Sequence, residues 1–320
     1  MTAFPAGHVV ARQGADCALG CKTSACGETP ADCAIFPPDH IWNTPVTDLP
    51  VDARSDAYIA SIGPDAGLHA DFGAGLYEGM PLGIPFVRVP ADQSPVEVVF
   101  TEAPDESDPG PYPIPADAPI EGSSCAEGDR HVLVVQEGSG LLYELYSAVP
   151  QPDGGWQAGS GAVFDLNDYA LRPATWTSAD AAGLPILPGL VRYEEIAAGA
   201  ITHALRFTAA QTQDAFVWPA RHAASDDPSP DLPPLGQRFR LKADVDIASF
   251  SPTNQIILTA LRTYGMMLAD NGSDWFLAGA PDDRWDNDDL HDLQARVTGG
   301  DFEAVDVSSL RRDADSGQAA

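Results

Sequence analysis

The chain has 320 residues, 44% of them hydrophobic, and its 17 basic and 47 acidic side chains give a formal net charge of −30. This composition indicates a globular protein with ample material for a core, not a disordered chain. The acidic excess argues against nucleic acid and anionic membrane surfaces, which require clustered cations, and favours a neutral or cationic ligand. No apolar run approaches the roughly 20 residues of a membrane helix, so we expect no membrane span.

Residues 1–34 form a leader that is rich in small residues and holds four of the five cysteines. These are Cys17, Cys21, Cys26 and Cys33. In an exported protein two local disulfides would hold such a segment together, whereas the intervals of three, four and six residues do not fit the paired C-x2-C spacing of a zinc knuckle. Cys125 is then a free thiol or a partner of the leader. The N-terminus has no basic region before an apolar stretch, so no signal peptide is expected in this chain.

Short apolar runs alternate with Pro-, Gly- and Asp-rich breaks between residues 35 and 307. A short helix is expected over residues 56–62, before a Gly-Pro stop, and two short strands over residues 84–100. Residues 102–119 form a proline-stiffened loop that is unsuited to a β-ladder. Because long ordered loops are often functional, its acids are candidates for a site. They are Asp105, Glu106 and Asp108.

A β-hairpin is predicted over residues 129–146, DRHVLVVQEGSGLLYELY, where two apolar runs flank a turn-rich break. The strand period places Leu142, Glu144 and Tyr146 on one face. A carboxylate between two apolar neighbours needs a partner, a metal or a wet cleft, because its unpaired burial is costly. Glu144 therefore lies at a sheet edge, or pairs with Arg130, or forms one wall of an active or binding cleft.

The second half of the chain continues the β-rich pattern. A brief helix is expected over residues 191–198, and strands over residues 201–208, 215–222, 237–247 and 275–279. One substantial helix begins with Ser251 as N-cap and Pro252 at its first position, and the apolar spacing carries it to Gly272. We expect a mainly β fold, a β-sandwich or jelly-roll-like single domain over residues 35–307, with long Pro/Gly/Asp-rich loops and a disordered tail over residues 308–320.

The chain lacks the common enzyme signatures, including the P-loop, the dinucleotide fingerprint, the G-x-S-x-G elbow and H-E-x-x-H. Its candidate chemistry lies in histidines and carboxylates scattered over strands, as in a β-sandwich enzyme; His69 and Asp71 belong to this scattered set. The candidate catalytic residues are Asp129, His131, Glu144, Asp165 and His203. Glu144 and Asp129 are the expected carboxylate pair for glycoside cleavage, and the two histidines would orient groups or carry protons.

Aromatic and basic residues near these groups are candidates for sugar binding, since aromatic planes suit the C–H faces of sugar rings; core packing is the alternative. The candidate substrate-binding residues are Tyr146, Trp156, Arg206, Trp218 and His222.

Two metal sites are open possibilities, although the sequence establishes no cofactor. His131, Glu144 and His203 offer ligands for zinc or another transition metal. Within the aspartate run at residues 281–292, Asp283, Asp286 and Asp288 offer oxygen ligands for calcium. The alternative for that run is a solvated acidic turn before a short helix.

Several phrases, in order, resemble a family of exported bacterial proteins that are common in soil and actinobacterial sequences. They are GDRHVLVV, LLYELY, GSGAVFDL, LRPATWTSADAAGLPILPGLVRYEE, ITHALRFT, VWPARH and YGMMLADNGSDWF. The resemblance covers residues 35–305 and implies export and a single unit. It assigns no activity and no catalytic residue. Relatives often carry a cysteine where this chain has Leu141 or Leu142, which would leave Cys125 without its usual partner.

These observations together predict a secreted carbohydrate-active enzyme, a glycoside hydrolase or polysaccharide lyase acting on an extracellular polysaccharide. A non-catalytic glycan-binding or self-assembling surface protein is one alternative, and a metal-dependent enzyme with a His/Glu site is another. The sequence does not indicate an oligomeric state.

Overall fold

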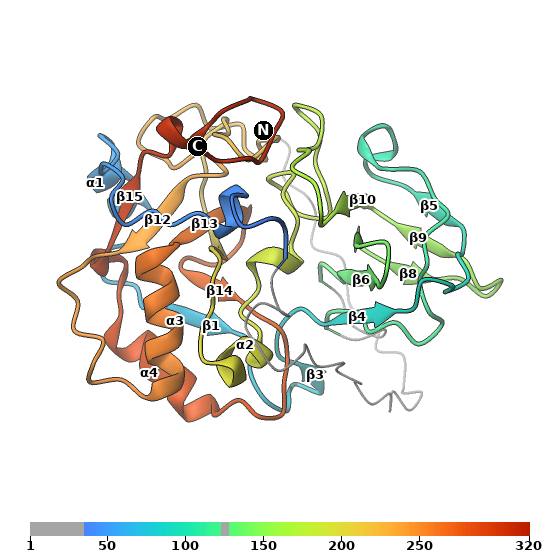
Figure 1. Ribbon diagram of the computed structural model, residues 1–320, viewed down its shortest axis with the longest axis horizontal. Coiled ribbons are helices and arrows are strands. Elements are labelled where there is room, and N and C mark those ends of the chain that lie inside the picture. Colours follow the sequence, from blue (N-terminus) through green and yellow to red (C-terminus); the bar gives the residue numbers. More distant parts are fainter. Residues whose placement is uncertain (1–34, 123–127) are drawn as a thin grey trace, which may run out of the picture.

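The strands of the protein are arranged in two lobes, and the chain passes between them twice, once between β1 and β4 and once after β10 (Figure 1). The computed structural model describes residues 35–122 and 128–320. The predicted disulfides of the leader and the state of Cys125 lie outside these residues. The protein is mainly β, as the sequence predicts.

The larger lobe is built on a six-stranded sheet whose strands come from both ends of the chain. In spatial order they are β1 (His69–Asp71), β14 (Phe276–Ala278), β11 (Leu205–Ala209), β13 (Met266–Asn271), β12 (Arg238–Leu241) and β15 (Phe302–Val305). β1 runs parallel to β14 and β11 parallel to β13, and the other pairs are antiparallel. The sheet therefore holds the N-terminal and C-terminal parts of the chain together.

Helices and an aromatic stack complete the larger lobe. α3 (Pro252–Thr263) packs on β12, α4 (Asn287–Arg296) on β1, and α1 (Ser55–Ile62) on β15. Trp275 is fully buried, with its ring 5.5 Å from that of Phe207 and 5.4 Å from that of Phe302, in both cases nearly parallel. This stack anchors three separate segments of the chain in one core.

The smaller lobe is a β-sandwich. One sheet contains β10 (Ser160–Asp165), β7 (Leu141–Tyr146), β6 (Val132–Gln136) and β4 (Phe86–Val89). The other contains β5 (Val98–Phe100), β9 (Trp156–Ala158) and β8 (Val149–Pro150). β6 and β7 form the predicted hairpin. One face of this hairpin packs on β5 and β9, and the opposite face packs on the segment that joins the lobes.

The remaining elements are short. β2 (Leu76–Tyr77) pairs with β3 (Met80–Pro81), and α2 (Tyr193–Ala198) ends at Gly199, whose φ of 90° suits glycine. Single 3-10 turns occur at Ile41–Asn43, Pro104–Glu106, Leu187–Gly189, Gly299–Asp301 and Ser308–Leu310. Among the described residues, no helix has the length and apolar character needed to cross a membrane.

α3 begins as predicted but ends earlier. Gly265 has a φ of +69°, and a Cβ there would lie 2.2 Å from the carbonyl oxygen of Phe239. The chain turns at this glycine, and the following apolar residues form β13 rather than continuing the helix to Gly272. The apolar spacing misled here because a central strand is apolar on both faces.

Two other predictions are wrong. Residues 215–222 do not form a strand; they make only an isolated bridge between Phe216 and Leu235. Residues 308–320 are not a disordered tail, since Gln318 bridges to His40 and Ala319, which is 2% exposed, donates its amide to Asp39. The polar composition of this tail hides its backbone pairing, which secures it to the larger lobe.

Replacement of Ser251 by alanine should destabilise the protein by about 1–2 kcal/mol. The Ser251 hydroxyl accepts the Asn254 amide at 3.1 Å and donates to Asp289 at 2.6 Å, so the variant loses the N-cap and the link between α3 and α4. Chemical denaturation monitored by circular dichroism measures the change. The exposed Ser94→Ala is the control, and equal stability of the two variants would contradict the capping role.

Candidate functional site

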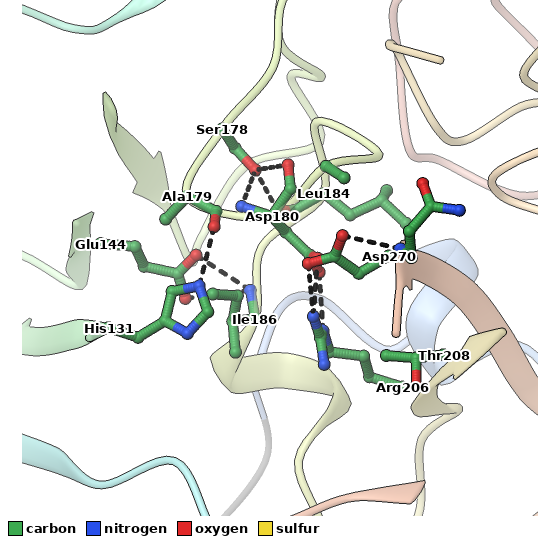
Figure 2. Close-up of polar contacts among 12 residues, drawn as sticks. His131, Glu144, Ser178, Ala179, Asp180, Leu184, Ile186, Arg206, Thr208 and Asp270 are labelled. Atoms are coloured by element: carbon green, nitrogen blue, oxygen red, sulfur yellow. Dashed lines mark hydrogen bonds and ion pairs between the residues drawn. The ribbon is translucent and has the colours of Figure 1, made fainter. Parts of the chain in front are cut away.

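The segment Ser178–Leu187 lies between the two lobes and is held by both. Ser160 of β10 donates its hydroxyl to the Ser178 carbonyl at 2.7 Å, from the smaller lobe. The Ala182 amide donates to Ala269 of β13 at 2.9 Å, in the larger lobe. Figure 2 shows His131 and Glu144 approaching this segment from one side and Arg206 and Asp270 from the other. We call it the bridging segment.

Glu144 binds the bridging segment through its backbone. Its carboxylate accepts the amides of Ile186, at 2.9 and 3.0 Å, and of Leu187, at 2.9 Å. The side chain is fully buried, and this burial raises the pKa of Glu144 to about 7 even though the two amides act in the opposite direction.

This position rules out two of the interpretations drawn from the sequence. Glu144 lies on β7, between β10 and β6, so it is not at a sheet edge. Backbone amides take the place of an ion pair with Arg130, whose guanidinium donates to the Ala148 carbonyl. A carboxylate with no exposed surface cannot contact a polysaccharide, so Glu144 is a structural residue and not a catalytic one.

Arg206 binds two acids at the larger-lobe side of the bridging segment. It donates from Nε and Nη2 to the two oxygens of Asp180, each at 2.8 Å, and from Nη2 to Asp270 at 3.1 Å. Asp180 is fully buried and Arg206 is 5% exposed. The sequence predicted that Arg206 binds substrate. In the structure it makes a bidentate contact with Asp180 and a single hydrogen bond to Asp270.

Asp270 differs from Asp180 because it reaches the surface. Its side chain is 20% exposed. Burial raises the pKa of Asp270 to about 7, the charge of Asp180 adds to this effect, and Arg206 opposes it. This carboxyl group is therefore poised to exchange a proton near neutral pH, and part of it reaches the surface.

His131, on the smaller-lobe side, contacts an acid and the bridging segment. Its Nδ1 lies 2.6 Å from Glu121 Oε2, and its Nε2 lies 3.0 Å from the Ala179 carbonyl oxygen. Burial lowers the pKa of His131, but the charge and hydrogen bond of Glu121 outweigh it and raise the pKa to about 9. The exposed Asp129 completes a group whose ligand atoms all lie within 4.8 Å of one another.

Asp71 faces the same space from β1. In the sheet register it lies opposite Ala278 of β14, and Phe207 lies opposite the neighbouring Leu277, so Asp71 and Arg206 share one face. Part of Asp71 is exposed to solvent. The protein around the carboxyl group still removes some of its hydration, and this desolvation raises the pKa of Asp71. The charge of Glu121 adds to the rise, whereas His69 and Arg206 oppose it.

These residues form what we call the seam cluster. Its members are Asp71, Glu121, Asp129, His131, Asp180, Arg206 and Asp270. Five carboxylates thus face two cationic side chains. Such a site favours proton transfer by carboxyl groups and the binding of a cation, and it disfavours a polyanion unless a cation accompanies it.

The other predicted catalytic residues lie elsewhere. His203 binds Glu195 at 3.0 Å, and that carboxylate also binds Arg192 at 2.7 Å, in a separate buried network. Asp165 accepts the Asn167 amide in an exposed turn. The predicted metal site of His131, Glu144 and His203 is therefore wrong, because Glu144 and His203 are engaged with other partners.

The predicted sugar-binding residues also separate. Trp156 is 4% exposed inside the smaller-lobe sandwich, and His222 contacts the Ala181 carbonyl at 2.8 Å. Tyr146 remains near the seam cluster, with its ring centre 5.9 Å from that of His131. Trp218 is 8% exposed and donates its indole N–H to the Ser316 carbonyl at 2.9 Å.

Trp218 lines a cavity of about 450 Å³ beside the C-terminal residues. Phe216 shares its wall, together with the charged Asp52, Arg221 and Asp306. This size lies within the range of small-ligand sites. The cavity adjoins the bridging segment, because the Arg221 amide donates to the Ala182 carbonyl at 2.8 Å.

The two acidic stretches singled out in the sequence have structural roles. Asp286 is the N-cap of α4, and within the described residues the one group of three metal-capable side chains is Glu121, Asp129 and His131. Asp283, Asp286 and Asp288 are thus not grouped for calcium. In the proline-rich loop, Glu106 accepts the Thr177 amide and Asp108 binds Arg172, so two of its acids hold the chain that leads into the bridging segment.

The sequence did not single out Glu121, Asp180 or Asp270. Asp270 lay within the stretch expected to be helical, and the other two lie in irregular chain with no period to reveal their direction. Comparison of the chain with protein-family models, curated proteins and solved structures finds no match, so the site is interpreted from its own geometry.

Replacement of Glu144 by alanine should destabilise the protein by about 3–5 kcal/mol, because two buried amides lose their acceptor and a cavity forms. Glu144→Gln, which keeps the volume and one acceptor oxygen, should lose less. Urea denaturation at pH 7 measures both variants. A change below about 1 kcal/mol in the alanine variant would show that the bridging segment does not depend on this contact.

Proposed function

We propose that the protein is an exported carbohydrate-active enzyme, a glycoside hydrolase or polysaccharide lyase, that acts on an extracellular polysaccharide at the seam cluster. Export is inferred from the cysteine-rich leader and from the sequence resemblance. The observation that carries the reaction is Asp270, a partly exposed carboxyl group with a pKa of about 7 that Arg206 holds in place. A carboxyl group of this kind suits proton transfer at neutral pH.

Asp270 acts as the proton donor in this proposal. In hydrolysis its carboxyl proton passes to the glycosidic oxygen as the bond to the leaving sugar breaks. Asp71, which shares a sheet face with Arg206, is the second carboxylate and takes a proton from the attacking water. In a lyase, Asp71 would instead remove the proton from a sugar carbon beside a carboxylate. Arg206 is a positioning residue, because it contacts Asp270 and not the sugar.

Replacement of Asp270 by asparagine should lower turnover at least about 100-fold, since the proton donor is lost. Wild-type activity should fall as the pH rises through about 7, because Asp270 then releases its proton and can no longer act as the acid. The assay is a screen of a polysaccharide panel for new reducing ends and for unsaturated products, followed by a pH profile on the best substrate.

Asp92→Asn is the matched control, because Asp92 is an exposed acid in a turn of the smaller lobe. It should retain full activity. Unchanged turnover in the Asp270 variant, with folding confirmed by its thermal transition, would refute the assignment of the proton donor. Reducing ends without unsaturated products would select hydrolysis, and unsaturated products would select elimination.

A second candidate function is non-catalytic glycan binding, which the 450 Å³ cavity beside Trp218 favours. Aromatic rings on its wall, together with acids and an arginine, are the groups that hold a neutral sugar. On this alternative the protein binds a glycan in the cavity and releases no sugar.

Replacement of the half-buried Phe216 by leucine should weaken glycan binding roughly tenfold if the cavity is the binding site, because the sugar loses an aromatic face. Isothermal titration with oligosaccharides of the same panel measures this change. Tyr77→Leu, which alters a 65% exposed aromatic residue that does not line the cavity, is the control. Equal affinities of the two variants would exclude the cavity.

A further inference from the structure

The environment of His131 fixes which ring nitrogen carries a hydrogen. Nε2 faces the Ala179 carbonyl oxygen at 3.0 Å, and a carbonyl oxygen can only accept, so Nε2 is the donor. Nδ1 faces Glu121 Oε2 at 2.6 Å. In the neutral ring Nδ1 carries a lone pair, so two electron-rich atoms meet at short distance. A positive centre must lie with them, either a second hydrogen or a metal ion.

The surroundings match those of a metal-binding histidine. Such a histidine usually donates its other ring N–H to a carbonyl or carboxylate, which fixes the ring and leaves the remaining nitrogen for the metal. The Ala179 carbonyl belongs to the bridging segment, which both lobes hold, so the ring is firmly oriented. His131 is 2% exposed, whereas the Glu121 side chain is 25% exposed, so the site opens toward solvent on the carboxylate side.

Asp129 supplies a third ligand. Its carboxylate oxygen lies within 4.8 Å of both His131 and Glu121 ligand atoms. Metal–ligand distances of about 2.0–2.2 Å would require Nδ1 and the Glu121 oxygen to separate by about half an ångström to one, a movement that a partly exposed carboxylate can make. One imidazole and two carboxylates form a ligand set for zinc or manganese, with room for water or substrate in the remaining positions.

The charge of the seam cluster is a second, independent observation. Arg206 donates its hydrogen bonds to Asp180 and Asp270, and it acts on Glu121 and Asp71 through its charge. Glu121 is the carboxylate that contacts His131 directly, and the seam cluster as a whole sets five carboxylates against two cationic side chains, so a divalent ion would offset an excess of negative charge.

We propose that Glu121, Asp129 and His131 bind one divalent transition-metal ion, zinc or manganese, at the start of β6. The proposal does not depend on glycan cleavage, because it concerns binding alone. It replaces the ligand set predicted from the sequence, of which only His131 remains.

The test is metal titration of the full chain after removal of metal with a chelator. Isothermal titration with MnCl₂ should give one site per chain, and MnCl₂ should raise the unfolding temperature. Manganese is the first probe because the thiols of the five cysteines bind zinc more readily than manganese and would obscure zinc binding at the proposed site. Glu121→Gln and Asp129→Asn should each weaken manganese binding at least tenfold. In the wild type, ZnCl₂ should compete with manganese for the same site.

Asp288→Asn, in the aspartate run, is the control and should bind manganese as the wild type does. Because Asp129 is exposed, its variant tests the site even if the Glu121 variant folds poorly. Two results would overturn the proposal: absence of manganese and zinc binding by the wild type, or binding that neither the Glu121 nor the Asp129 variant weakens. In both cases the contact between His131 and Glu121 is a simple ion pair.

Discussion

The buried pairing of Arg206 with Asp180 is the interaction on which the arrangement of the two lobes depends. Arg206 belongs to the six-stranded sheet, and Asp180 to the bridging segment. Both charges are almost entirely removed from water, so either one without the other would carry a large desolvation cost. Glu144 fixes the same segment from the smaller lobe through two backbone amides. Buried charges therefore set the position of the segment through which much of the contact between the lobes is made.

This mode of assembly explains why ionisable groups with shifted pKa values gather at the junction. Carboxylates that hold the bridging segment lie beside carboxylates that reach the surface, and burial raises the pKa of both Glu144 and Asp270 to about 7. Of these two residues, only Asp270 reaches the surface. The raised pKa of Glu144 is thus a consequence of its buried structural role. The carboxyl group of Asp270 has a similar pKa and also reaches the surface, where it is a candidate for proton transfer.

The elements that the sequence predicted well are those with a regular period and clear end signals. The hairpin of β6 and β7, its two faces, and the start of α3 at Ser251 follow from alternation and capping. Prediction failed where tertiary pairing overrides composition. β13 looked helical, residues 215–222 looked like a strand, and the polar C-terminal residues looked disordered although they pair with residues near His40. Of the residues singled out in the sequence, His131, Asp129, Arg206 and Tyr146 lie at the junction, whereas His203, Asp165 and Trp156 do not.

The mainly β character, the acidic balance and the carboxylate on one face of a hairpin could be derived from the amino-acid sequence, because composition and a period of two are local properties. The role of that carboxylate depends on contacts made in the folded protein. Glu144 meets amides 42 and 43 residues away, and Arg206 meets Asp180 and Asp270, 26 and 64 residues away. No local pattern encodes such partners, since they are set by how two separate sheets pack on one irregular segment. The fold therefore determines which charged side chains are buried in structural contacts and which reach the surface.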